Sequence, residues 1–276
     1  MGNNILVTGG AGSIGSELVR QLSENNRVIV FDINETAMFD LVEELQLEGR
    51  DVEGKVGDVR DENSLMNYFL GKERPTLIIN ASALKHVTPC EWDPKEAVMT
   101  NVIGTHNLIN LAKGFGIPLI NISTDKVVNP KSVMGMTKAI AERMVRNAGF
   151  VSVRFANVLG SRGSVIPIWQ KQADENKPLT ITDSRMERYF MSIPQAVKLI
   201  IKAINLGDPG DVIVLEMGQP MRIIDLAKEI IEKSGKNLGI REIGARPGES
   251  LTEELMSAEE KQKAIKEGDY WIIKDK

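Results

Sequence analysis

Short apolar runs alternate with segments of helical periodicity along the first 155 residues of the chain. Each run is about five residues long and ends at glycine or at a polar residue, which is typical of buried parallel strands. Between the runs, apolar residues recur at every third or fourth position, as they do on amphipathic helices. The strand-like runs lie at 4–8, 27–32, 52–56, 76–80, 118–123 and 150–155, and the helical patterns lie at 14–22, 38–45, 65–69, 97–111 and 136–145.

This alternation predicts right-handed βαβ units and an α/β fold with a doubly wound parallel sheet. The alternation stops after Leu159, where a loop rich in glycine and serine follows. We therefore expect residues 1–159 to form the main domain, joined by a returning strand and helix near 192–218. Residues 160–276 are expected to form mainly a smaller C-terminal lobe.

Regular patterns reappear in this second part of the chain. The stretch at 180–188 is polar and irregular, whereas in later segments apolar residues recur at regular spacing. Trp271 lies among the last ten residues, which show no motif that can be interpreted. The predicted elements are a helix at 193–204, a strand at 211–216 that could return to the main sheet, and a helix at 223–231 that can end at Gly235.

Composition excludes several classes of protein. The chain has 276 residues, of which 42% are hydrophobic and 26% are charged, and its net charge is −4. A net charge of −4 does not suit a protein that binds nucleic acid. Cys90 is the single cysteine and there are two histidines, so neither a disulfide framework nor a metal site is expected. We see no signal peptide and no apolar run near the ~18 residues of a bilayer span, so we expect a cytoplasmic protein without membrane insertion.

Glycines follow the first strand at a spacing that suits a bound diphosphate. Gly9, Gly12 and Gly15 lie between a strand and a helix, and Asp32 ends the second strand. Residues without a Cβ atom let a pyrophosphate approach the backbone, and the helix N-terminus offers it free N–H groups. Asp32 could accept hydrogen bonds from ribose hydroxyls and would repel a 2′-phosphate. The pattern predicts a site for NAD rather than NADP, although Asp32 would also suit a turn or an N-cap.

Three chemically active residues, Thr124, Asp125 and Lys126, follow the strand at 118–123. The carboxyl ends of parallel strands face the ligand crevice of an open α/β sheet, so these side chains are candidates for a site. Lys138 follows on the next predicted helix, and Met134 precedes it by one helical turn. The structural alternative is an exposed ion pair between Asp125 and Lys126 at the end of a strand.

Longer stretches spread along the chain carry more specific signals than the glycine loop. They are TGGAGSIGSELV, GDVRD, NASALKHVTPCEWDPKEAVMTNVIGTHNLI, ISTDKVVNPKSVMGMTKAIAE, RFANVLGSRGSVIPIW, TDSRMERYFM, VLEMGQPMRIIDLAKEI and RPGESLTEEL. These features resemble the extended short-chain dehydrogenase/reductase superfamily. Within it, the chain is similar to the polysaccharide-biosynthesis branch of UDP-N-acetylglucosamine 4,6-dehydratases, some of which are also 5-epimerases. The resemblance implies a Rossmann-type NAD domain, a UDP-sugar substrate, a cytoplasmic catalytic half and a homo-oligomer of two or more copies.

The reaction that the resemblance implies has three parts. Hydride leaves C4 of the sugar to NAD, water is lost across C5–C6, and hydride returns to C6. The product is a UDP-2-acetamido-2,6-dideoxy-4-hexulose for surface polysaccharide or glycan biosynthesis. By resemblance, Asp125 is the acid at the C6 hydroxyl and Lys126 is the base at C5.

These roles require unusual protonation. The pKa of Asp125 must rise and that of Lys126 must fall, as burial would cause, whereas a plain ion pair would have the opposite effect on both. We therefore expect either a desolvated site or proton exchange within the pair when substrate binds.

Met134 occupies the position at which the superfamily usually carries a tyrosine. A thioether cannot take the proton of the C4 hydroxyl. We expect Thr124 to replace the tyrosine, with help from Asp125. Some family members carry methionine here, so the change does not indicate an inactive copy. By resemblance, Lys138 contacts the nicotinamide ribose.

The resemblance implies a wider set of binding residues. Lys85 is expected beside the nicotinamide and the sugar, and Arg246 resembles an arginine that clamps the UDP diphosphate. Arg188 could equally be a solvated surface arginine, and Glu249 could be structural. The cofactor set is Gly9, Gly12, Ser13, Ile14, Gly15, Asp32, Asp58, Val59, Ala81, Ser82, Ala83, Asn101 and Lys138, and the substrate set is Lys85, Asn157, Ser164, Val165, Arg188, Arg246 and Glu249.

Two other functions remain open on the sequence. A nucleotide-sugar 4-epimerase would share the NAD site and the UDP clamp but would not need an acid–base pair at C5–C6, so the STDK motif argues against it. A non-catalytic NAD-binding sensor would explain the missing tyrosine.

Overall fold

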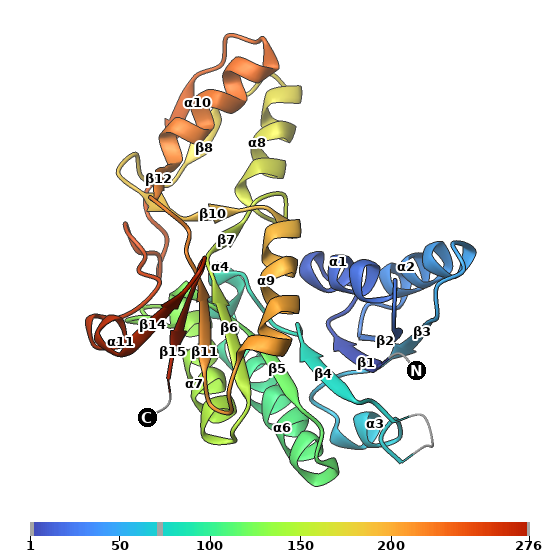
Figure 1. Cartoon of the computed structure of the whole chain (residues 1–276). Helices are drawn as coiled ribbons and strands as arrows, with labels where there is room; N and C mark the ends of the chain where they lie inside the picture. The colour runs from blue at the N-terminus through green and yellow to red at the C-terminus, as the bar shows by residue number, and fades with distance from the viewer. Residues whose placement is uncertain (1–2, 71–73, 275–276) are drawn as a thin grey trace.

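A nine-stranded sheet forms the centre of the computed structural model, which describes residues 3–70 and 74–274 (Figure 1). Its strands are β1 (Asn4–Thr8), β2 (Arg27–Asp32), β3 (Val52–Val56), β4 (Leu77–Asn80), β5 (Leu119–Thr124), β6 (Val151–Phe155), β11 (Val212–Leu215), β14 (Ala264–Glu267) and β15 (Tyr270–Ile273). Their spatial order is β14-β15-β11-β6-β5-β4-β1-β2-β3. All pairs from β3 to β11 are parallel, and β15 and β14 add an antiparallel edge. The strand order reverses between β1 and β4, which is where such sheets bind ligands.

Helices cover both faces of the sheet and bury its strands. One face packs against α1 (Ser13–Leu22), α2 (Glu35–Leu47) and α9 (Ile193–Leu206). The opposite face packs against α3 (Glu62–Met66), α6 (Gly104–Phe115) and α7 (Val133–Asn147). Because the central strands are covered on both sides, their sequences are continuous apolar runs rather than alternating ones. The predicted doubly wound α/β fold is therefore confirmed.

Two details of the main sheet differ from the sequence prediction. The helix predicted at 97–111 is instead α5 (Pro94–Val98), a π-helical turn at Met99–Ile103 and then α6, preceded by the separate α4 (Val87–Trp92). The apolar period continues through the π turn, so the sequence pattern does not show it. Residues 270–273, within the stretch that showed no motif, form β15, which pairs with β11 on one side and with the edge strand β14 on the other.

A smaller group of elements lies above the carboxyl ends of the strands (Figure 1). It has its own apolar core around Trp169, whose indole N–H donates to the carbonyl of Thr180 at 2.7 Å. Gly235 ends the last long helix with a φ of 65°, as the sequence predicted. The elements are α8 (Val165–Asp174), β8 (Leu179–Ile181), β9 (Glu187–Arg188), β12 (Met221–Arg222), α10 (Ile223–Ser234) and β13 (Ile240–Glu242), with β7 (Asn157–Val158) pairing with β10 (Phe190–Met191) below them.

A buried ionic cluster joins Glu260, late in the chain, to Arg154 in the middle of the sheet. Arg154 on β6 is 2% exposed and its guanidinium lies between Glu142 of α7, at 2.5 Å, and Glu260 of α11 (Ala258–Lys263), at 2.9 Å. Ser123 of β5 donates its hydroxyl to Glu142. Burial alone would lower the pKa of Arg154, but the two carboxylates outweigh burial and raise it. Every charge in the cluster has a partner, which is the condition under which buried charges are tolerated.

Replacing Arg154 by methionine should therefore lower the free energy of unfolding by about 3–5 kcal/mol, because two buried carboxylates lose their counter-ion. Urea denaturation monitored by circular dichroism measures this change. The matched control is Lys177→Met, which breaks a solvent-exposed pair with Glu175 and should leave the free energy of unfolding almost unchanged. Equal losses in the two variants would contradict this account of the cluster.

Candidate functional site

The predicted cofactor loop lies at the reversal point of the sheet. Gly9 has a φ of 65°, and a Cβ atom there would lie 2.7 Å from the backbone of Ala81 after β4. Gly12 precedes α1 without a side-chain cap, so the first N–H groups of that helix, beginning at Ser13 and Ile14, are available to an anion. Gly15 packs against the carbonyl of Gly9 with no room for a side chain. This geometry has the features of a diphosphate cradle.

Asp32 has structural partners beside this loop. One carboxylate oxygen accepts from the backbone N–H of Ala11 and the other from that of Asn34, both at 2.9 Å. Asp32 therefore fixes the glycine loop and forms a turn, and each oxygen still has a lone pair for a ribose hydroxyl. Asp58 is paired with Arg60; burial raises the pKa of Asp58, but the hydrogen bonds and charge of Arg60 outweigh burial and lower it.

The loop after β4 forms another wall of the site. Ala81 and Ser82 follow the strand directly and lie against the glycine loop, and Ala83 comes next in the chain. Asn101, in the π turn, holds this loop, because its side chain accepts from the N–H of Leu84 at 2.8 Å and donates to its carbonyl at 3.0 Å.

Arg162 is a residue that the sequence analysis missed. Its backbone N–H donates to the hydroxyl of Ser13, and its guanidinium donates to the carbonyl of Ala11 at 2.8 Å, so its loop lies over the start of α1. The pKa of Lys85 is lowered by desolvation and by the charge of Arg162, which indicates that the two cations are close. The motif GSRGSVIP contains Arg162, but nothing in the pattern shows that this loop meets the glycine loop.

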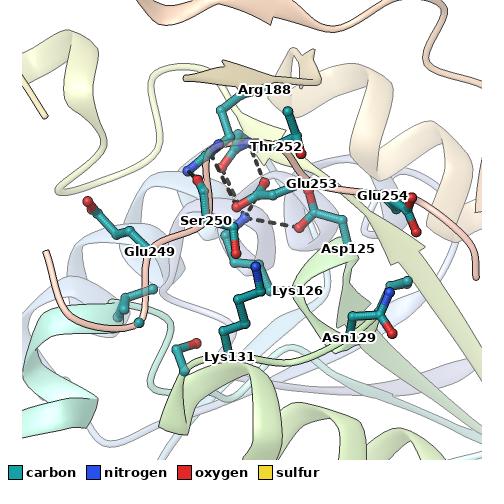
Figure 2. Close-up of a pocket in the computed structure, with 15 residues that line it drawn as sticks. Asp125, Lys126, Asn129, Lys131, Arg188, Glu249, Ser250, Thr252, Glu253 and Glu254 are labelled. Atoms are coloured by element: carbon teal, nitrogen blue, oxygen red, sulfur yellow. Dashed lines mark hydrogen bonds and ion pairs between the residues drawn. The ribbon is translucent and has the colours of Figure 1, made fainter. Parts of the chain in front are cut away.

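Asp125 and Lys126 lie at the carboxyl end of β5 and form an ion pair. The Nζ atom of Lys126 is 3.0 Å from Asp125 Oδ1, 3.2 Å from Asn157 Oδ1 and 2.9 Å from Glu253 Oε2. Asp125 is buried, and its Oδ1 also accepts the hydroxyl proton of Thr124 at 2.9 Å. The carboxylate of Glu253 also contacts Arg188 at 3.2 Å, and Figure 2 shows these groups side by side. The predicted pair is therefore part of a larger buried cluster.

The protonation expected from burial alone is wrong for this pair. Burial would raise the pKa of Asp125, but the charge of Lys126 and hydrogen bonds from its neighbours outweigh burial and lower it. Burial would lower the pKa of Lys126, but the charges of Asp125 and Glu253 raise it. The pKa of Glu253 is instead raised, first by burial. Without a ligand the pair is ionised, so proton exchange within the pair is the remaining route to the predicted roles.

Lys138 and Met134 occupy different environments on α7. The Nζ atom of Lys138 donates to the carbonyl of Ile122 on β5 at 2.5 Å, and burial lowers its pKa to about 8 although Glu142 opposes the shift. Met134 is 3% exposed and packs in an apolar cluster with Cys90 and Ala97. Its thioether therefore fills space against α4 and α5.

Two adjoining cavities open beside the cluster. One, of roughly 370 Å³, is lined by Asp125, Lys126, Asn157, Arg188 and Glu249 among others, and the other is of roughly 240 Å³. The second cavity is lined by every predicted substrate residue except Lys85: Asn157, Ser164, Val165, Arg188, Arg246 and Glu249.

The second cavity contains groups that suit an anion. Ser164 precedes α8 without capping it, and its buried hydroxyl oxygen has no hydrogen-bond partner among the described residues. Arg246 is exposed on the rim, and the side chain of Glu249 accepts from its backbone N–H at 3.1 Å, which gives Glu249 a structural role in the turn. Arg188 is buried, and its guanidinium already donates to backbone carbonyls of Glu187, Ser250 and Leu251, which favours a structural role for it as well.

Solved structures share this fold over nearly the whole chain. The structure of Pen from Bacillus thuringiensis superposes with a TM-score of 0.93 and 34% identity, covering 98% of this chain and 89% of that chain. DesIV of Streptomyces venezuelae, a dTDP-glucose 4,6-dehydratase with NAD and TYD bound, has a TM-score of 0.82 and 22% identity, covering 94% of this chain and 90% of its own. These likenesses define a Rossmann-type fold of the extended short-chain dehydrogenase/reductase class.

Sequence relatives indicate a narrower group of proteins within this class. The chain is 45% identical to a protein of Methanocaldococcus jannaschii described as an uncharacterized membrane protein, over 93% of this chain and 81% of the relative. It is 42% identical to the capsular polysaccharide biosynthesis protein CapD of Staphylococcus aureus over 93% of this chain, and it spans 45% of CapD. It is 36% identical to a UDP-glucose 4-epimerase of Rickettsia bellii, over 98% of this chain and 82% of the relative.

The family model described as polysaccharide biosynthesis protein matches residues 5–275. The chain belongs to this family, the polysaccharide-biosynthesis branch of the extended short-chain dehydrogenases/reductases. Within residues 3–70 and 74–274, no helix has the length and apolar character needed to cross a membrane.

The lowered pKa of Lys138 predicts a specific effect of pH on stability. Between about pH 8 and the ordinary lysine value of 10.5, the unfolded chain binds a proton at this position that the folded protein does not. Below about pH 8, the folded protein therefore bears the whole free-energy cost of burying the charged ammonium group of Lys138. This cost disappears as the pH rises toward 10.5. The free energy of unfolding of wild type, relative to Lys138→Met, should rise by about 3 kcal/mol across this window. Denaturant titrations at several pH values measure it, and a constant difference would contradict a neutral Lys138 above pH 8.

Proposed function

We propose that this protein is a UDP-N-acetylglucosamine 4,6-dehydratase that uses bound NAD. The observation that carries the proposal is the buried Asp125–Lys126 pair, which lies at the carboxyl end of β5 and opens on a cavity of roughly 370 Å³. Loss of water across C5–C6 needs one acid and one base, whereas simple oxidation of a sugar does not need this second pair.

The glycine loop fits the diphosphate of the cofactor. Gly9 and Gly15 leave no room for side chains, α1 has no side-chain cap, and Asp32 keeps free lone pairs for ribose hydroxyls. Arg162 adds a positive charge over this loop. When bound, NAD supplies the acceptor and donor of hydride. Lys138, held by the carbonyl of Ile122, would orient the nicotinamide ribose.

The second cavity suits the diphosphate and sugar of the substrate. The N-terminus of α8 and the unpartnered hydroxyl of Ser164 offer donors to an anion, and Arg246 on the rim can provide a planar pair of donors. We propose that this lobe binds the UDP-sugar while the main sheet binds the cofactor. Asn157 lines both cavities and would mark the junction between diphosphate and sugar.

The proton chemistry can be balanced with the residues present. One proton moves from Lys126 to Asp125, which leaves a neutral amine and a carboxylic acid. The amine then takes the C5 proton as the C5–H bond breaks, and Asp125 gives its proton to the C6 oxygen as the C6–O bond breaks and water leaves. Lys126 is again an ammonium and Asp125 a carboxylate. When C6 receives the hydride, Lys126 gives its proton to C5 and takes another from water, which replaces the proton that the C4 hydroxyl lost to water through Thr124. The pair then returns to its starting state.

A second candidate is a UDP-sugar 4-epimerase. Its support is the match to the Rickettsia bellii protein of that name, which extends over 98% of this chain. Epimerisation at C4 would use the same cofactor and nucleotide sites but would leave the 6-hydroxyl in place and exchange no proton at C5.

Incubation with UDP-N-acetylglucosamine in deuterated water separates these candidates. We expect a 4-keto-6-deoxy product with solvent deuterium at C5, detected by NMR and mass spectrometry. Lys126→Met should lower turnover by about 10²–10⁴-fold, because the base is lost. The control is Lys131→Met, which removes another lysine that lines the same cavity but is exposed, and should leave kcat almost unchanged.

Retention of the 6-hydroxyl in every product would exclude the dehydratase. Binding of NAD without turnover of any UDP-hexosamine would support the non-catalytic sensor.

Thr124 is the proposed proton acceptor for the C4 hydroxyl, because its own hydroxyl already connects to Asp125 at 2.9 Å. Replacing Thr124 by valine removes this relay and should slow the first oxidation by about 10²-fold, whereas Thr124→Ser keeps the hydroxyl and should retain most of the rate. Single-turnover formation of reduced nicotinamide, followed by absorbance, measures this step directly. If the valine variant oxidises C4 at the wild-type rate, another group accepts the proton.

A further inference from the structure

Glu253 reaches the Asp125–Lys126 pair from a segment with no helix or strand. Buried arginines hold both ends of this segment, residues 250–255: Arg188 donates to two backbone carbonyls near its start and Arg154 to one near its end, at 2.7 to 3.1 Å. The Glu253 side chain is 7% exposed. The fold therefore holds this buried carboxyl group beside the proposed catalytic pair.

The ammonium group of Lys126 is fully engaged in this arrangement. It has three protons to donate and no lone pair, and three acceptors surround it: Asp125, Asn157 and Glu253. Figure 2 shows Asp125 and Glu253 beside it. In this state Lys126 cannot accept a proton from C5. It must first lose one, and the amide of Asn157 is not a base, so the proton has to move to one of the two carboxylates.

Transfer to Asp125 would create the base and the acid in a single step. An ionised Glu253 would oppose this transfer, because its attraction to the charged lysine, 2.9 Å away, is stronger than its repulsion of the Asp125 carboxylate. A neutral Glu253 would remove this opposition while still accepting a hydrogen bond from Nζ.

A second observation also indicates a proton on Glu253. The Oδ2 atom of Asp125 is buried and has no hydrogen-bond donor among the described residues, which is costly for a carboxylate oxygen. The carboxyl groups of Glu253 and Asp125 are neighbours, because both contact the Nζ atom of Lys126, at 2.9 and 3.0 Å. An O–H group on Glu253 could donate to this carboxylate and satisfy it.

We propose that Glu253 works in its protonated form, as the positioning residue that allows Lys126 to pass a proton to Asp125. This role rests on the proposed dehydration. Glu253 keeps its own proton throughout, so the transfers among Lys126, Asp125 and the sugar remain balanced.

The surroundings of Glu253 shift its pKa in opposite directions. Burial and the charge of Asp125 raise its pKa, and Lys126 and Arg188 lower it. The resulting pKa lies above the ordinary glutamate value, so the proton is held through at least part of the pH range in which ordinary glutamates are ionised.

Kinetics of Glu253→Gln and Glu253→Ala test the proposal. Glutamine has nearly the same shape, stays neutral and can both donate and accept, so E253Q should keep kcat within about threefold of wild type. It should also remove any loss of rate at high pH that comes from ionisation of Glu253. Alanine removes the hydrogen bonds and admits water, so E253A should lose at least about 30-fold. If E253Q falls as far as E253A, Glu253 acts as an anion and the proposal is overturned.

The neighbouring Glu254 provides the control. It is exposed and stands apart from Glu253 beside the same cavity, so Glu254→Gln makes the same chemical change outside the cluster (Figure 2). E254Q should match wild type in kcat and in its pH profile.

A measurement that needs no turnover tests the proton directly. In protein carrying ¹³C at the δ-carbon of glutamate, one NMR signal should titrate above the range of the other glutamates. That signal should be absent from E253Q and present in E254Q. Titration of Glu253 at or below the ordinary range would overturn the proposal whatever reaction the enzyme catalyses. A raised titration together with retained 6-hydroxyl in all products would leave the proton on Glu253 established and exclude only the dehydration.

Discussion

The ammonium group of Lys126, held between the carboxylate of Asp125 and the carboxyl group of Glu253, is the interaction on which the site depends. Asp125 is its neighbour in sequence, whereas Glu253 is 127 residues further along the chain. Burying charges is tolerated only where partners compensate for lost hydration. Removing Asp125 or Lys126 would therefore leave the other charge buried without its counter-ion, and the fold of the segment around Glu253 sets the surroundings of this pair.

A second buried cluster lies next to the first along β5. Arg154, Glu142 and Glu260 connect β6, α7 and α11, and Ser123 joins them from β5. Thr124 and the Asp125–Lys126 pair directly follow Ser123. Because Lys138 also hydrogen-bonds the backbone of β5, the strand that ends at this pair is held by side chains of α7 at two points. In the proposed reaction, such support would keep the reacting groups in a fixed geometry.

The position of Met134 shows how one fold can carry different chemistry. Its side chain packs against Cys90 and Ala97, so α7 keeps its place even though the tyrosine of the wider superfamily is absent. In the proposed reaction, the proton chemistry depends instead on the groups at the end of β5. Proteins named as dehydratases and as epimerases share this fold, so the fold does not identify the reaction, and the side chains at the strand ends must do so.

The sequence by itself determined the alternation of strands and helices, the glycine loop and the Asp125–Lys126 pair, because each of these depends on residues close together in the chain. Apolar periodicity located β1 to β6 and the returning β11, and the spacing of Gly9, Gly12 and Gly15 located the start of α1. Only the tertiary structure decided what depends on distant contacts. It brought Glu253 to Lys126, laid Arg162 over Ser13, and paired β15 with β11. The motif RPGESLTEEL contains Glu253 and Glu254 side by side, and no local pattern distinguishes them. Buried arginines hold both ends of this segment, so Glu253 is buried beside Lys126 whereas Glu254 is exposed to solvent. The contacts within the cluster also decide that the ion pair, rather than desolvation, sets the charges of Asp125 and Lys126.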